Sequence, residues 1–254
     1  MGKISTKVSF TFDDVLIRPA ASSLEPREAE LGTAIARGFF LTLPILSAAM
    51  DKVTEDGMAV VLGKLGGLGI IHRNNTAEEE AALVAKAKKE KVKVGAACSP
   101  FDLDRALKLV KAGADVIAID SAHGHNLNVI SGAKKIKKAI GKTPLLVGNI
   151  ATAEAARELV KFADGIKVGI GPGSICTTRI VSGVGVPQLS AILDVVAVAQ
   201  KAGVPVIADG GMRNSGDIAK ALAAGASAVM LGNLLAGTDA APGKLVEKDG
   251  KKFK

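Results

Sequence analysis

Short apolar runs alternate along this chain with stretches in which apolar residues recur every three or four positions. The short runs are rich in Val, Ile and Ala, as buried strands are. We predict eight of them, over residues 44–50, 68–72, 92–97, 115–120, 145–149, 166–170, 205–209 and 228–231. The stretches between them predict helices over residues 54–64, 76–89, 103–110, 127–140, 153–162, 189–202 and 217–224.

This alternation favours a parallel sheet covered by helices, because strands that are apolar on both faces must be buried on both. Eight repeats in 254 residues fit a TIM (β/α)8 barrel better than an open sheet. The sequence has no linker or composition break inside the repeats. We therefore predict one barrel domain over residues 1–254.

Several local signals refine this prediction. Thr76 and Glu79 have the spacing of a capping box, which places a helix start at that point. Residues 27–40 predict a short hairpin that covers the bottom of the barrel, and residues 244–254 form a basic tail. One face of the third helix is marked by Leu103, Ala106, Leu107 and Val110.

Composition limits the classes of function. There are two cysteines, which give no disulfide framework and favour a reducing cytoplasm. No apolar run approaches the length of a membrane-spanning helix, so no membrane association is expected. The net charge of +8 comes largely from lysines in helical patterns, without the interleaved aromatic residues of single-strand binders. We therefore expect no nucleic-acid partner, although the charge would help to attract an anionic nucleotide.

A glycine-rich segment after the sixth strand, residues 169–179, holds the strongest candidate for chemistry. Its glycines and proline predict an irregular loop with little helix propensity. Backbone amides there could bind an anion, or carbonyls a monovalent cation. Cys176 is the one strong nucleophile within reach.

Polar residues and glycines also follow the other strands, where a barrel gathers its active site. Gly210 and Gly211 follow the seventh strand, and Gly232 and Asn233 the eighth, which is where barrel phosphate sites commonly lie. Asp209 is an ionised acceptor suited to a vicinal diol. Cys98 is predicted to be a packed thiol, and a metal site at His123 and His125 is disfavoured because no acidic or cysteine cluster accompanies them.

The chain resembles the IMP dehydrogenase / GMP reductase family over nearly its whole length. The longest match is the loop GPGSICTTRIVSGVGVPQ, residues 171–188. Others are TFDDVLIRP, ILSAAMDKVTE, GGLGIIHRN, IDSAHGH, GNIATAEAA and the run from Val204 to Thr238. The 179–187 segment looks like the dehydrogenase form of the loop.

This resemblance implies the catalytic part of the site. Cys176 would add to C2 of the purine of IMP, with Thr178 beside the reacting centre. Hydride would pass to NAD, and water would then release XMP. A potassium ion would be held by the backbone carbonyls of Gly171, Gly173 and Cys176.

The resemblance also implies where the two nucleotides bind. Asp120 and Ser121 would contact the cofactor. The IMP site would be formed by Met50, Asn149, Ser174, Asp209, Gly210, Gly211, Gly232 and Asn233. GMP reductase, which uses NADPH, is the alternative enzyme. The family implies a homotetramer or homo-octamer.

Two departures from the family pattern lead to further expectations. The regulatory nucleotide-binding insertion is predicted to be absent between about residues 73 and 92. The family's purine-gripping turn and mobile flap would follow Lys254, where this sequence stops. A nucleotide-binding barrel with impaired turnover is therefore a third possibility, in which NADH forms once and the adduct on Cys176 persists.

Overall fold

Eight parallel strands close into a barrel in this computed structural model, which describes residues 8–244, 246–248 and 251–253. The closed order is β10-β3-β4-β5-β6-β7-β8-β9, so neighbours in sequence are neighbours in space. The prediction of a TIM barrel is confirmed. The strands are β3 (Ile45–Ser47), β4 (Leu68–Ile71), β5 (Val94–Cys98), β6 (Val116–Asp120), β7 (Leu145–Ile150), β8 (Gly165–Val168), β9 (Val206–Asp209) and β10 (Ala228–Leu231).

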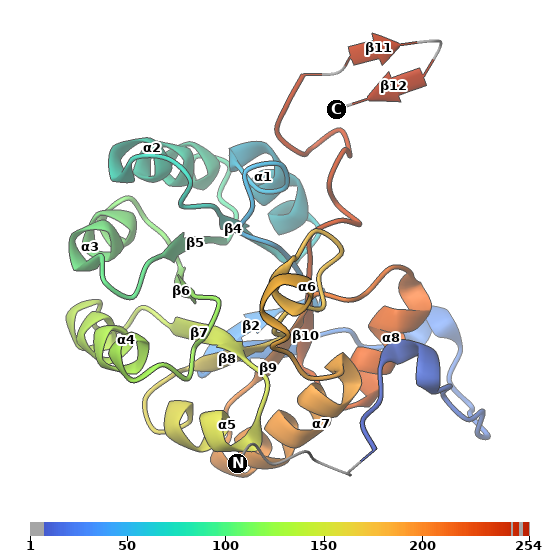
Figure 1. Cartoon of the computed structure of the whole chain (residues 1–254). Helices are drawn as coiled ribbons and strands as arrows, with labels where there is room; N and C mark the ends of the chain where they lie inside the picture. Colours follow the sequence, from blue (N-terminus) through green and yellow to red (C-terminus); the bar gives the residue numbers. More distant parts are fainter. Residues whose placement is uncertain (1–7, 245, 249–250, 254) are drawn as a thin grey trace.

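Helices ring the barrel on its outside (Figure 1). They are α1 (Asp56–Lys64), α2 (Ala77–Lys88), α3 (Leu103–Lys111), α4 (Leu127–Ala139), α5 (Ala153–Leu159), α7 (Gln188–Ala199) and α8 (Ser215–Ala223). The capping box at Thr76 is present, because its hydroxyl accepts from the Glu79 amide while the Glu79 carboxylate accepts from the Thr76 amide. Residues 72–76 connect β4 directly to α2. No helix in the described part of the chain has the length and apolar character needed to cross a membrane.

The buried apolar residues form two layers. One lies between strands and helices and includes Ile166 and Val168 of β8. The other fills the barrel and includes Leu146, Ile207 and Met230. Because side chains alternate along a strand, Lys167 between Ile166 and Val168 points into the barrel.

The predicted hairpin is present at the amino ends of the strands. β1 (Thr33–Ala36) pairs with β2 (Phe39–Leu41), and Ile35 joins the barrel-filling layer. The Arg37 amide donates to the carbonyl of Asp164, directly before β8. The hairpin therefore closes the bottom of the barrel and leaves the carboxyl ends of the strands open.

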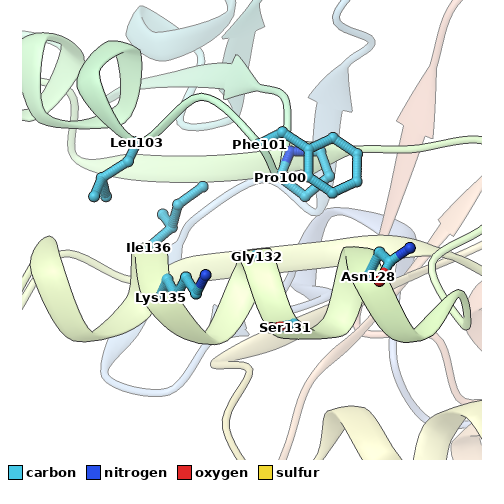
Figure 2. A pocket seen from close by; sticks show the side chains of 8 residues that line it. All are labelled: Pro100, Phe101, Leu103, Asn128, Ser131, Gly132, Lys135 and Ile136. Carbon is cyan, nitrogen blue, oxygen red and sulfur yellow. The ribbon is translucent and has the colours of Figure 1, made fainter.

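The face of α3 that the sequence marks is only partly buried. Ala106 and Leu109 are fully buried, whereas Leu103 and Leu107 are 38% and 42% exposed. At 100° per residue the inward stripe runs through Ala106, Leu109 and Val110, and Leu103 and Leu107 lie on its flank. Leu103 instead borders a groove of about 380 Å³ on the outside of the barrel, with Pro100, Phe101 and Ile136 (Figure 2).

The loop predicted to be irregular contains regular structure, and so does the basic tail. α6 (Thr178–Ser182) is a short helix inside the glycine-rich loop. It is closed by Gly183, whose φ of +69° gives the left-handed conformation that glycine adopts freely. In the basic tail, β11 (Val246–Lys248) pairs with β12 (Lys251–Phe253), and this hairpin projects away from the barrel (Figure 1).

Candidate active site

A cavity of about 350 Å³ opens at the carboxyl ends of the strands. It is shared by the segments that follow β3, β8, β9 and β10. All of the predicted substrate-binding residues except Asn149 line it, namely Met50, Ser174, Asp209, Gly210, Gly211, Gly232 and Asn233. The fold thus brings together residues that are far apart in the sequence.

The rim of this cavity suits an anion. Gly210 and Gly211 have φ values of +87° and +85°, which turn the chain sharply after β9 and pack it against Pro172. Within the described residues, the backbone amides of Gly211, Ser174 and Asn233 have no hydrogen-bond partner. Lys52 adds positive charge to the lining, which also includes Asp51 and Arg213, the latter paired with Asp13 and Asp217. Free amides with nearby cations are the usual environment of a bound phosphate.

Asp209 ends β9 with one carboxylate oxygen held and the other free. Its Oδ2 accepts from Asn149 Nδ2 at 2.9 Å and from Lys167 Nζ at 3.0 Å. Its Oδ1 has no hydrogen-bond partner among the described residues, and the side chain is 18% exposed. Asn149 Nδ2 also donates to Gly169 O at 2.8 Å, so Asn149 lies behind Asp209 instead of lining the cavity.

Lys167 is a member of this cluster that the sequence interpretation missed. Burial works against its protonated form, but the carboxylates of Asp209 and Asp120 outweigh this effect and raise the pKa of Lys167. The side chain is therefore an ammonium at neutral pH. A single cation inside the apolar run 165–170 was the available signal.

Cys176 lies in the loop beside the cavity, next to Ile175, which lines it. Its Sγ is 3.2 Å from Thr178 Oγ1. Hydrogen bonds from the side chain and backbone of Thr178 lower the pKa of the Cys176 thiol, with help from the Arg179 charge, while partial burial and Asp209 oppose the shift. The predicted catalytic pair is thus in contact, in an arrangement that favours the thiolate.

Two further residues hold the loop in place. Arg179 donates from Nε to Ile170 O at 3.2 Å and from its terminal nitrogen to Val186 O at 2.6 Å, so it joins the two ends of the loop. Gln188 Nε2 donates to Val168 O at 3.0 Å and to Asp209 O at 3.1 Å. Both residues fall within the matched loop, yet a positioning role for either is visible only in three dimensions.

The predicted cofactor residues lie outside the cavity lining, at the end of β6. The carboxylate of Asp120 is 40% exposed and lies 3.5 Å from Arg73 Nε. The carbonyl oxygen of Ser121 accepts a hydrogen bond from the backbone N–H of Asn149 at 2.8 Å. Asn149 therefore connects this second region to Asp209.

The remaining candidates are placed as follows. Of the carbonyls predicted to hold potassium, that of Gly173 accepts from the Cys176 amide at 3.0 Å. Cys98 is buried as predicted, and burial raises the pKa of its thiol to about 12. The rings of His123 and His125 are 6.4 Å apart, and the described residues contain no group of three His, Cys, Asp or Glu side chains able to hold a metal.

Comparison with known proteins places the chain in a family. The family model of the IMP dehydrogenase / GMP reductase domain matches residues 9–254. The inosine-5′-monophosphate dehydrogenase of Cryptosporidium parvum is 45% identical, over 96% of this chain and 72% of that protein. Those of Borreliella burgdorferi and Methanocaldococcus jannaschii are 42% and 38% identical, over 98% and 99% of this chain and 75% and 76% of theirs. The chain belongs to the IMP dehydrogenase / GMP reductase family.

Proposed function

We propose that this protein oxidises IMP to XMP with NAD, a step toward guanine nucleotides. The observation that carries the proposal is a thiol with a lowered pKa, Cys176, on a loop that also lines a cavity with anion-binding features. Relatives that cover nearly the whole chain carry the name of this activity.

The nucleotide would bind by its phosphate to the free amides of Gly211, Ser174 and Asn233. The ribose hydroxyls would donate to Asp209 Oδ1, which is the unpartnered oxygen of that carboxylate. Met50 lines the same cavity and would contact the purine. This orientation would direct C2 of the base toward the loop that carries Cys176.

The Cys176 thiolate would then add to C2, which forms an S–C2 bond. The hydrogen at C2 would leave with its electron pair, and NAD, when bound, supplies the acceptor for that hydride. Water would attack C2 of the resulting thioimidate, and the S–C2 bond would break to restore the thiolate. The sum is IMP, NAD and water giving XMP, NADH and a proton.

The residues present fit an NAD ribose, because Asp120 offers a partly exposed carboxylate acceptor at the mouth of the barrel. Asp120 and Ser121 would orient the nicotinamide end. A potassium ion would be held by the backbone carbonyls of Gly171, Gly173 and Cys176, and no step of the reaction depends on it. The Gly173 carbonyl accepts one hydrogen bond, from the Cys176 amide, and keeps a second lone pair that an ion could use.

We propose a homotetramer or homo-octamer, as the family resemblance implies. Light scattering would test this assembly.

Two free cysteines, one of them with a lowered pKa, suit a reducing compartment such as the cytoplasm.

Incubation of the protein with IMP and NAD, followed by NADH absorbance and XMP chromatography, tests the proposed function. Stoichiometric NADH and XMP that depend on IMP are expected. Oxidation of NADPH with GMP and release of ammonia would assign GMP reductase instead. A single equivalent of NADH with little XMP, or tight binding of IMP with neither reaction, would leave a nucleotide-binding barrel with impaired turnover.

A further inference from the structure

Lys167 has an unusual position for a lysine, because its side chain is 4% exposed and lies inside the barrel. Glycine at position 148 leaves room for it, since a Cβ there would lie 2.6 Å from Lys167 Cβ. Met230 Sδ lies 3.9 Å from its Nζ on another side. Burial of an ammonium in such surroundings is costly unless a partner compensates for it.

The partner is Asp209, and the contact is specific to one oxygen. Lys167 Nζ and Asn149 Nδ2 both bind Oδ2, at 3.0 and 2.9 Å. Two donors on the same oxygen fix the rotation of the carboxylate. They leave Oδ1 at the cavity with its lone pairs unused.

A carboxylate held in this way can accept from a ligand without first losing protein partners or side-chain freedom. Pre-organisation of this kind improves affinity and specificity because less ordering is required on binding. Selectivity for a hydroxyl is strongest where a buried polar group would be left unpaired by an analogue that lacks it.

We propose that Lys167 is a positioning residue that, through Asp209, makes the site selective for nucleotides with an intact ribose diol. The inference rests on the proposed function in that it takes Asp209 as the acceptor for the ribose hydroxyls. Lys167 itself touches no substrate in this proposal.

The test measures binding by calorimetry, so it does not depend on turnover. Wild type, Lys167→Met, Asp209→Asn and the double variant are titrated with IMP and with 2′,3′-dideoxy-IMP. Lys88→Met is the matched control, because it breaks a Lys–Asp pair of 2.8 Å at the opposite end of the barrel. Lys167→Gln, which keeps an N–H donor and removes the charge, replaces Lys167→Met if that variant does not fold.

We expect Lys167→Met to weaken IMP binding by about tenfold, as for loss of a hydrogen bond to a charged group, with dideoxy-IMP binding nearly unchanged. The preference of Lys167→Met for IMP over dideoxy-IMP should therefore fall toward the preference of Asp209→Asn. The double variant should have nearly the same preference as Asp209→Asn alone. Lys88→Met should keep the wild-type preference.

Each other outcome has a distinct meaning. Loss of the preference in Asp209→Asn but not in Lys167→Met would overturn this inference and leave the proposed function standing. A preserved preference in Asp209→Asn, or no IMP binding by wild type, would instead contradict the proposed function and the inference with it. Equal weakening toward both ligands, or failure of both Lys167 variants to fold, would assign Lys167 to general stability and overturn the inference.

Discussion

The two cysteines of this chain have opposite environments. Thr178 lowers the pKa of Cys176 by hydrogen bonding, whereas burial raises that of Cys98 to about 12. Alkylation requires a thiolate that the reagent can reach. We therefore predict that iodoacetamide modifies Cys176 in the folded protein and reaches Cys98 only after denaturation. Peptide mass spectrometry would measure both rates, with Cys176→Ser as control. Comparable labelling of Cys98 in the native state would contradict the structure.

Thr178 should control the reactivity of that thiol directly. Thr178→Val keeps the shape of the side chain and removes the hydroxyl 3.2 Å from Sγ. The pKa of Cys176 should rise, and its alkylation profile should move to higher pH. At neutral pH the rate of Cys176 alkylation should fall by up to about tenfold for each unit by which the pKa of the thiol rises. Thr177→Val is the neighbouring control, and an identical profile in Thr178→Val and wild type would exclude this role.

At the scale of the element, one side chain holds the loop between β8 and α7 in its conformation. Arg179 binds the carbonyls of Ile170 and Val186 and so joins the ends of the loop. We predict that Arg179→Ala speeds amide hydrogen exchange across residues 171–187 and slows Cys176 alkylation. The free energy of unfolding should change by less than about 1 kcal/mol, because the loop lies outside the core. Arg157→Ala, an exposed substitution on α5, should change neither rate. Unchanged exchange in Arg179→Ala would rule out this function for the side chain.

Helices α2 and α3 are joined by a buried pair that should make stability depend on pH. Glu80 is fully buried, and Arg105 donates to its Oε2 at 2.6 Å. Burial raises the pKa of Glu80 from 4.5 to about 8, against the influence of Arg105. Between pH 4.5 and about pH 8, Glu80 therefore keeps its proton in the folded protein and loses it in the unfolded chain. This contribution to stability is present in full below pH 4.5 and is lost as pH rises toward 8.

Glu80→Gln removes this titration. Relative to wild type, the variant should gain stability between about pH 5 and about pH 8, by at most about 1.4 kcal/mol for each pH unit. Urea unfolding at a series of pH values would measure the difference. Glu78→Gln, an exposed substitution on the same helix, should not show this gain. A constant difference between Glu80→Gln and wild type would contradict the raised pKa.

The regular elements were predictable because their signals are local. Apolar runs located the eight barrel strands, and Thr76 with Glu79 located the start of α2. The errors arise where tertiary contacts decide. α6 forms although glycines surround it, since the Arg179 side chain joins the two ends of the loop that contains it and Gly183 ends the helix. The buried stripe of α3 depends on how that helix lies on the barrel. Lys167 was missed because its role depends on Asp209, which is 42 positions away.

At the scale of the whole molecule, closure of the barrel assembles the site. The hairpin of β1 and β2 closes one end, and the polar residues collect at the other. The amides proposed to bind phosphate, the Asp209 carboxylate and the Cys176 thiol lie at the end of β9 or on the segments that follow β8, β9 and β10, which the closed sheet holds side by side. Binding and covalent chemistry should therefore be separable by substitution.

Cys176→Ala tests that separation most directly. IMP binding by calorimetry and NADH formation with IMP and NAD would be measured on the same preparations of wild type and variant. We predict that the variant binds IMP nearly as well as wild type, forms no NADH and shows no IMP-dependent mass adduct, whereas wild type forms NADH and carries its adduct on the Cys176 peptide. NADH formation by Cys176→Ala, or an adduct on another residue in wild type, would contradict the assignment of Cys176 as the nucleophile.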